Sequence, residues 1–393
     1  MDILFVGQLV PCMGGAAIVG TQLVAGFAAA GHRVRALVPR VVESPWTAEQ
    51  CVKAHPEVRV SCYPAPDCVH GWFRRMDEPS RLQERTLLRK LLTDSIATER
   101  PDVVVFGKTP YAWHAADLVA AARLPSVLVC QGAWAAELPA RIGGADLLTQ
   151  LRRRVSRIVA VANHMVMPLK RLGLTNVSPV PNGVDLARFA PRCKDGTLLR
   201  RLALTPADVV VLHASNLVEV KRPLDVARSA ELAVASAPEL AYVIVGEGCG
   251  RTSLEKICQA AGMVDRFRFT GWVEHAKMAD YLNLADIVVM TSDSEALPLV
   301  YLEAQACGRV LVTSDIPASR EVVVDGQNGL LFRMGDVAAL AARVLLAGRD
   351  EGLRREIGEN ARQAVRAYDV RRSVAAHLAI VTEVAAQGPS SSS

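Results

Sequence analysis

The chain has 393 residues, enough for two or three domains, and 51% of them are hydrophobic, as in globular proteins with a large core. No apolar run reaches the roughly 18 residues that span a bilayer, so a membrane-spanning helix is not expected. The net charge of +5 is uneven, since residues 1–190 hold 22 Lys and Arg against 15 Asp and Glu. This basic excess is most typical of solvated helix faces, and attraction of an acidic acceptor or an anionic lipid surface is the alternative.

The N-terminus and the cysteines indicate the compartment. Residues 1–7 carry an acid where a signal peptide would be positive, and their apolar run predicts a buried strand. Nine cysteines occur without a Cys-x-x-Cys pair, which fits reduced, mostly buried thiols better than disulfides or zinc. We therefore expect a cytoplasmic protein, free or peripheral to the inner face of the membrane through its basic first half. Nucleic acid is not an expected partner, because no binding module is present and aromatic residues are sparse.

The first 180 residues predict a parallel sheet covered by helices. A strand at 2–7 is followed by Gly14 and Gly15, a helix at 16–30 and a second strand at 34–38, which together make a βαβ unit. Residues 43–100 predict loops around one strand at 58–62 and a charged helix at 80–98. Further strands are expected at 102–106, 126–130 and 157–161. No G-x-G-x-x-G follows the first strand, so a Rossmann-type oxidoreductase is poorly supported.

The run from Pro181 to Asp185 is turn-forming and is the expected boundary between two domains. After it, strands are predicted at 208–213, 241–246, 267–270, 287–290 and 310–313, with helices between them at 223–236, 253–261 and 277–284. Helices at 337–347 and 351–367 follow. A last helix at about 369–387 is expected to pack back on the first domain, before a disordered tail at 388–393. The predicted fold class is therefore α/β, with two doubly wound Rossmann-like domains (1–183 and 184–368) that face each other across a cleft.

Residues 291–308 form the first candidate site. An apolar strand ends in small polar residues, Glu295 follows, and a helical pattern begins near Pro298, a residue suited to a first helical turn. The unpaired amides of that turn and the helix dipole favour an anion such as phosphate. Glu295 and Glu303 are carboxylates, which bind hydroxyl groups well. The stretch therefore predicts a site for a sugar nucleotide, and the alternative is an ordinary strand–helix unit with two solvated glutamates.

Three other segments of the second half also place a polar or glycine-containing loop after a strand: 214–223, 246–251 and 271–273. With these segments, the chain resembles the retaining glycosyltransferases of family 4, which have the two-domain GT-B fold. The resemblance covers nearly the whole chain, and the order and spacing of its motifs are specific. They are Gly14-Gly15, Gly31 to Val34, the turn at 181–185, the Lys221 loop, Gly246-x-Gly248, the pair Glu295 and Glu303, and Asp325 to Leu331.

The resemblance implies roles for individual residues. Lys221 and Glu295 are the implied catalytic residues: Lys221 neutralises the donor pyrophosphate, and Glu295 holds hydroxyls of the donor sugar. Glu303 holds the ribose diol, and Trp272 and Val273 border the base. The remaining implied donor-binding residues are Gly14, Gly15, Gln131, Asn216, Arg222, Gly246, Gly248, Ala296, Leu297, Pro298, Leu299 and Val300.

The implied reaction moves a sugar from a UDP- or GDP-sugar to an acceptor hydroxyl with retention, giving an α-linkage. No cofactor and no metal are implied, and the chain contains no Asp-x-Asp. The implied mechanism is attack on the same face of the sugar, with the leaving phosphate oxygen helping to deprotonate the acceptor. Catalysis then consists mainly of positioning and charge stabilisation.

Four residues, at three places in the sequence, depart from the family pattern. Asn216 stands where an arginine often provides a second pyrophosphate clamp, and residues 215–222 resemble the subgroup that makes N-acetylglucosaminyl-malate. Gln131 replaces a usual histidine beside the donor sugar; it can form hydrogen bonds but cannot carry charge. Ala296 and Leu297 replace the common Gly-Phe, which changes the wall of the sugar pocket. The expected acceptor is a small acidic molecule, a glycan or a lipid-linked glycan.

Two other functions remain open. The departures at Gln131 and Asn216 allow a non-catalytic or weakened protein that binds a sugar nucleotide. A nucleotide-sugar epimerase of related fold would need an acid or base group at the sugar, which Gln131 does not supply. Among the histidines, His213 is expected to be packed rather than catalytic, and His275 to lie at the surface where a helix starts. The cluster at 72–75 is expected to be a packed surface loop, with an acceptor or membrane lip as its alternative.

Overall fold

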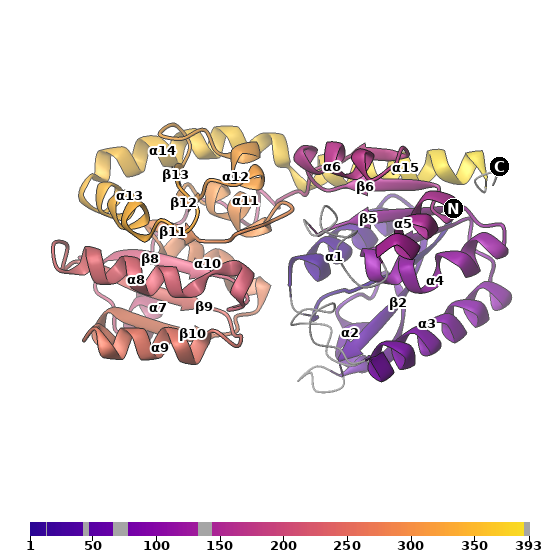
Figure 1. Cartoon of the computed structure of the whole chain (residues 1–393), viewed down its shortest axis with the longest axis horizontal. Helices are drawn as coiled ribbons and strands as arrows, with labels where there is room; N and C mark the ends of the chain where they lie inside the picture. Colours follow the sequence, from indigo (N-terminus) through magenta and orange to yellow (C-terminus); the bar gives the residue numbers. More distant parts are fainter. Residues whose placement is uncertain (13, 42–46, 66–77, 133–143, 389–393) are drawn as a thin grey trace. The chain divides into compact units, whose positions relative to one another are not determined.

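The computed structural model describes residues 1–12, 14–41, 47–65, 78–132 and 144–388. The chain forms two compact units, one of Met1–Gly183 and Val370–Ser393 and the other of Val184–Asp369. Each unit is a parallel sheet covered by helices (Figure 1). The predicted fold class, two doubly wound Rossmann-like domains, is therefore confirmed. Among the helices in the described ranges, none is long and apolar enough to cross a membrane.

The first sheet has the strand order β3-β2-β1-β4-β5-β6-β7, and all neighbouring strands are parallel. The chain thus adds strands on one side of β1 and then continues on the other side, beginning with β4. The strands span Arg59–Ala65 (β3), Arg33–Val41 (β2), Asp2–Val6 (β1), Val103–Phe106 (β4), Ser126–Cys130 (β5), Arg157–Ala160 (β6) and Val177–Pro179 (β7).

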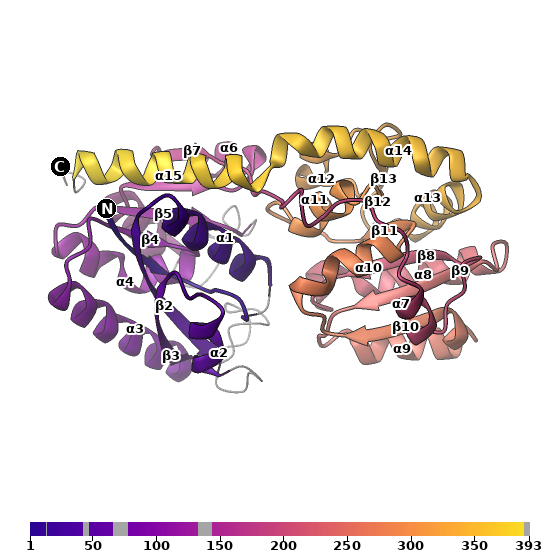
Figure 2. The same ribbon diagram turned by 180° about the vertical axis from the view of Figure 1, so that it is seen from behind.

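Helices cover the first sheet, and its central strands are buried. Ile3 to Val6 have no exposed surface, as expected for a parallel sheet covered on both faces. The helices are α1 (Gly15–Ala29), α2 (Ala48–Lys53), α3 (Glu78–Thr98), α4 (Thr109–Ala121), α5 (Gly144–Arg154), α6 (Val166–Arg171) and α15 (Val370–Gln387). Helix α15, the last element of the chain, packs on α1 and on β4, β5 and β6 (Figure 2). Its residues His377, Val381 and Val384 are buried there.

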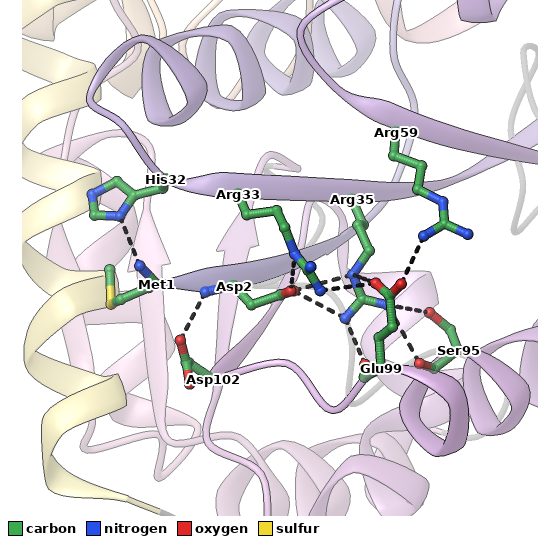
Figure 3. A network of polar contacts seen from close by, with 9 residues as sticks. All are labelled: Met1, Asp2, His32, Arg33, Arg35, Arg59, Ser95, Glu99 and Asp102. Atoms are coloured by element: carbon green, nitrogen blue, oxygen red, sulfur yellow. Dashed lines mark hydrogen bonds and ion pairs between the residues drawn. The ribbon is translucent and has the colours of Figure 1, made fainter.

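The amino edge of the first sheet is closed by a network of ion pairs (Figure 3). Arg35 lies 2.9 Å from Asp2 and donates 2.6 Å to the carbonyl of Glu99. Arg33 and Arg59 reach the same Glu99 carboxylate from the first residues of β2 and β3, at 2.8 and 2.9 Å. The network ties the starts of three strands to the end of α3, so it serves the fold. The opposite edge, at the carboxyl ends of the strands, is the usual place for a ligand site in such sheets.

The second sheet has the order β10-β9-β8-β11-β12-β13 and is also parallel. Its strands span Phe267–Gly271 (β10), Leu240–Val245 (β9), Val209–Ala214 (β8), Ile287–Met290 (β11), Val310–Ser314 (β12) and Leu330–Phe332 (β13). The helices are α7 (Gly196–Arg201), α8 (Pro223–Val234), α9 (Arg251–Ala260), α10 (Met278–Leu284), α11 (Leu299–Ala306), α12 (Pro317–Val322), α13 (Val337–Arg349) and α14 (Glu351–Ala364). One hydrophobic cluster, including Val211, Tyr242 and Val289, joins this sheet to the helices.

Sequence patterns missed some short elements. Within 43–100 the prediction lacked α2, a six-residue helix whose start is fixed by a capping box between Thr47 and Gln50. It also lacked β7, a three-residue strand that ends in Pro179. Such elements are too short to show a hydrophobic period. The predictions for the cluster at 72–75 and for residues 389–393 lie outside the described residues.

Candidate functional site

The second sheet reverses its strand order between β8 and β11. In open sheets of this kind, ligands bind outside the carboxyl ends of the strands at such a reversal of strand order. Lys221 lies in the loop after β8, in a short 3₁₀ helix (η3, Glu219–Lys221). Glu295 lies in the loop after β11. The topology therefore brings together two residues that are 74 positions apart in the sequence.

Lys221 and Glu295 form an ion pair, with Nζ 2.5 Å from Oε1. Ser292 donates a second hydrogen bond of 2.7 Å to the same carboxylate oxygen. The two side chains keep 23% and 10% of their surface exposed, so the pair is covered but reachable from solvent. An ammonium group has three hydrogens, so Lys221 can hold Glu295 and phosphate oxygens at the same time.

The loops after β8 and β11 are fastened to each other by hydrogen bonds. Thr291 Oγ1 lies 2.7 Å from the carbonyl oxygen of Lys221 and 3.0 Å from that of Arg222. The amide of Asp293 donates to the carbonyl of Val220 at 2.9 Å. Because the backbone around both charged residues is tied, their side chains start from fixed positions.

Arg222 lies beside the pair in a left-handed backbone conformation, with φ of 46°. Few residues other than glycine adopt this conformation, and such positions cluster at functional sites. Its guanidinium binds Asp225 at 2.7 Å and lies 3.4 Å from Asp293. The hydrogen bond that Arg222 donates to Asp225 and the negative charges of Asp225 and Asp293 raise the pKa of Arg222, so the group stays cationic.

A glycine loop after β9 forms the next part of the site. The loops after β8 and β9 are joined by Leu217 N–H donating to the Glu247 carbonyl at 2.8 Å, next to Asn216. Gly246 and Gly248 have φ of 123° and 157°. A Cβ atom at Gly246 would lie 2.0 Å from the carbonyl oxygen of Ser215. Only glycine fits here, because the loops approach each other backbone to backbone.

Helix α11 begins at Leu299, directly after Pro298, which caps it in an extended conformation. Its first turn, with Leu299 and Val300, presents backbone N–H groups that have no partner within the helix. Ala296 and Leu297, in the loop before α11, are 8% and 3% exposed, so both residues are buried. A helix start shortly after Glu295, the ion-pair partner of Lys221, is a favourable place for a phosphate group.

Glu303 lies in α11, is 5% exposed, and accepts a 2.6 Å hydrogen bond from His275 Nε2. His275 starts a 3₁₀ helix as predicted, but the prediction that it lies at the surface was wrong: its side chain is 17% exposed and its ring packs against Phe189. Sequence reasoning missed this contact because the partners are 28 residues apart. Trp272 and Val273, which follow β10 and precede His275, are half-buried.

Three expected donor contacts belong to the first unit. Gly14 precedes α1 with φ of 100°, and Gly15 is the first residue of that helix. Gln131 follows β5, and its Nε2 donates 3.3 Å to the carbonyl of Gly107, which follows β4. All three follow strands of the first sheet: Gly14 and Gly15 come after β1, and Gln131 comes directly after β5. The other expected site residues lie in the second unit.

His213, at the end of β8, is fully buried, which confirms that it is packed. Its Nδ1 donates 2.9 Å to the Val289 carbonyl, and its Nε2 lies 2.8 Å from Ser215 Oγ. Burial, together with the nearby charge of Lys221, lowers the pKa of His213 to about 4. The ring is therefore neutral at pH 7 and supports the loop that carries Asn216.

Two family models match the chain. The model described as "Glycosyltransferase Family 4" matches residues 13–188, and the model "Glycosyl transferases group 1" matches residues 198–364, so together they cover most of the sequence. Among solved structures, Anabaena Alr3699/HepE in complex with UDP and glucose aligns with a TM-score of 0.79 at 19% identity, over 98% of this chain and 100% of that one. Fold and matches define a protein of the GT-B class. The two halves of the chain thus contain a glycosyltransferase family 4 domain and a glycosyl transferases group 1 domain.

Curated relatives match part of the chain. D-inositol 3-phosphate glycosyltransferase 2 of Catenulispora acidiphila is 32% identical over 240 residues, 57% of this chain and 55% of that protein. N-acetyl-alpha-D-glucosaminyl L-malate synthase of Bacillus anthracis is 27% identical over 211 residues, 53% of this chain and 54% of that protein. The chain thus spans about half the length of the curated relatives it matches.

Proposed function

We propose that the protein transfers a sugar from a nucleotide-diphosphate sugar to an acceptor hydroxyl. The observation that carries this proposal is the Lys221–Glu295 pair at the strand-order reversal of the second sheet, beside the first turn of α11. A cation and free helix amides suit a diphosphate, and a carboxylate beside them suits sugar hydroxyls. UDP is the favoured nucleotide, because the HepE structure was determined with UDP and glucose; GDP is the alternative.

The residues of the second unit divide the donor between them. Lys221, Arg222 and the α11 amides take the diphosphate, where negative charge grows as the bond to the sugar breaks. Glu295 holds the sugar hydroxyls. Glu303 holds the ribose diol, and its bond to His275 fixes the carboxylate for that role. The segment at Trp272 and Val273 borders the base.

The proposed chemistry is retention, giving an α-linkage without a metal or cofactor. The acceptor hydroxyl attacks from the face that the diphosphate leaves, and a leaving phosphate oxygen takes its proton. The first domain supplies the acceptor side, with Gly14, Gly15 and Gln131 completing the donor contacts. The named relatives use an inositol phosphate and malate, so a small anionic acceptor is favoured over a glycan or glycolipid. The basic first half also suits a peripheral contact with an anionic membrane.

Thermal unfolding with nucleotides tests the donor site. A ligand at 100 times its Kd adds about 2.7 kcal/mol to the stability of the state that binds it. We expect stabilisation by UDP or a UDP-sugar, less by UMP, and none by uridine, because the diphosphate makes the main contacts. If no nucleoside diphosphate or its sugar derivative stabilises the protein, the proposed donor site is wrong. Equal stabilisation by uridine and UDP would contradict the proposal that Lys221 binds the diphosphate.

A further inference from the structure

Three cysteines from separate segments of the first unit meet beside β3. Cys12 follows β1, and its Sγ donates 3.5 Å to the carbonyl of Pro39 in β2. The register of β2 and β3 pairs Val38 with Cys62, one position before Pro39. The Cys62 Sγ in turn lies 4.0 Å from the carbonyl of Ala48, the first residue of α2. Cys51 lies three residues after Ala48, on the same side of α2.

Cys51 and Cys62 lie close together, because Cys62 packs on the first residue of α2 and Cys51 lies on the same side of that short helix. The interaction between the two thiols raises the pKa of Cys51 and lowers the pKa of Cys62, and the charge of Arg40 lowers the pKa of Cys62 further. Cys51 is 5% exposed, whereas Cys62 is partly exposed. The reactive form of cysteine is the thiolate. Cys62 is therefore the accessible nucleophile, and Cys51 is the thiol behind it.

We propose that Cys51 and Cys62 form a thiol modification site that a peroxide oxidises to a disulfide. The Cys62 thiolate attacks one peroxide oxygen, the O–O bond breaks, and Cys62 sulfenic acid and hydroxide are formed. Cys51 then attacks the sulfenic sulfur, and the departing oxygen leaves as water with the Cys51 proton. Two thiols are oxidised and one peroxide is reduced to two waters. A small thiol reverses the step by exchange.

The site is connected to the loop that leads from β1 to Gly14 and the start of α1. Helix α2 runs directly into His55, whose Nε2 lies 2.6 Å from the carbonyl of Val10 in that loop. Linking Cys51 to Cys62 pins α2 to β3 and shifts the contact with Val10. We expect the disulfide to lower the rate of sugar transfer. This effect on the rate rests on the proposed function, whereas the formation of the disulfide is independent of it.

Peptide mapping of the full-length protein tests the site. After treatment with hydrogen peroxide and blocking of free thiols, we expect one linked pair of peptides, 41–53 and 60–74, lacking two hydrogen atoms. Cleavage before Asp67 separates Cys62 from Cys68, which shares its tryptic peptide. In Cys51→Ser the link is absent and a sulfenic acid on Cys62 is trapped by dimedone. Cys193→Ser removes an exposed cysteine of the second unit and leaves the link unchanged.

Several results would overturn the inference. In the peroxide-treated wild type, Cys51 and Cys62 could both remain free thiols, or Cys62 could be linked to Cys12. Sulfenic acid could also appear first on Cys193 or Cys249. These outcomes are read on the wild type and need no variant to fold. The regulatory step is separate: if the mapped disulfide forms but the transfer rate equals that of the reduced protein, the coupling to Gly14 and Gly15 is wrong and the site stands.

Discussion

Lys221 meets Glu295 in a covered but reachable position, and the proposed charge stabilisation depends on that ammonium group. We expect Lys221→Met to lower kcat/KM for the donor by about 100-fold or more, because removing one preorganised charge-stabilising donor typically costs that much. Glu295 keeps its bond from Ser292, so the fold should survive the change. The measurement is steady-state transfer together with the circular dichroism spectrum.

The second unit offers a matched control. Lys194 forms a similar ion pair with Asp286, at 2.6 Å and with the same 23% of the lysine side chain exposed. Lys194→Met removes a lysine of equal burial outside the candidate site, so it should leave kcat/KM nearly unchanged. Equal losses in the two variants would mean that Lys221 acts through stability alone, and full activity of Lys221→Met would place the site elsewhere.

His213 makes the stability of the second unit depend on pH. Its pKa is about 4 in the folded protein and 6.5 when unperturbed, so the unfolded state binds more protons between these values. The contribution of neutral His213 to the free energy of unfolding is therefore complete above about pH 6.5. It is lost as the pH falls toward 4, by up to about 3 kcal/mol. Urea unfolding of the wild type and of His213→Asn at about pH 7.5 and 4.5 measures it. The variant should lose less on acidification, and an equal loss would contradict the shift.

At the residue scale, the resemblance of the sequence to a family predicts roles for Lys221, Glu295 and Glu303, and these roles stay predictions. The structure shows that Lys221 and Glu295 meet. The sequence could not identify the partner of Glu303. His275 reaches that carboxylate only because the segment after β10 and helix α11 come together in the fold. Nor could the sequence predict the left-handed backbone conformation of Arg222. Glycine usually marks such a conformation, and this position is an arginine.

At the element scale, the glycine loop after β9 sets how closely the loops after β8 and β9 approach. We expect Gly246→Ala to destabilise the second unit by more than about 3 kcal/mol, since the new Cβ would meet a backbone carbonyl and φ would stay positive. Gly262→Ala is the control: its φ is 66° and nothing lies within 4 Å of its Cβ position, so it should cost only about 1–2 kcal/mol. Equal costs in urea unfolding would show that the close approach is not rigid.

Elements with a clear hydrophobic run could be predicted from sequence. The strand predicted at 208–213 is β8 at Val209–Ala214, and the helix predicted at 16–30 is α1 at Gly15–Ala29. The six-residue α2 could not be predicted, because its only local signal is the capping box at Thr47. That omission also hid the meeting of Cys51 with Cys62, which depends on where α2 packs.

At the scale of the whole molecule, the alternation of strands and helices in both halves specifies two parallel sheets, because parallel neighbours need a crossover between them. Each sheet places its loops at a strand-order reversal, after β1 and β4 in the first unit and after β8 and β11 in the second. The last helix, α15, belongs to the first unit although it follows the second in sequence. The acceptor is not determined by this architecture, since it depends on loop side chains.

The proposed transfer of a sugar from a nucleotide to an acceptor can be measured directly. The direct measurement combines isotope-labelled UDP-sugars with candidate acceptors, including an inositol phosphate and malate, and follows the products by mass spectrometry and NMR. We expect a labelled glycoside with an α-anomeric signal and an equal amount of UDP, both formed at least about 100-fold more slowly with Lys221→Met. A donor that returns unchanged with every acceptor, or that is converted into its epimer without one, would contradict it.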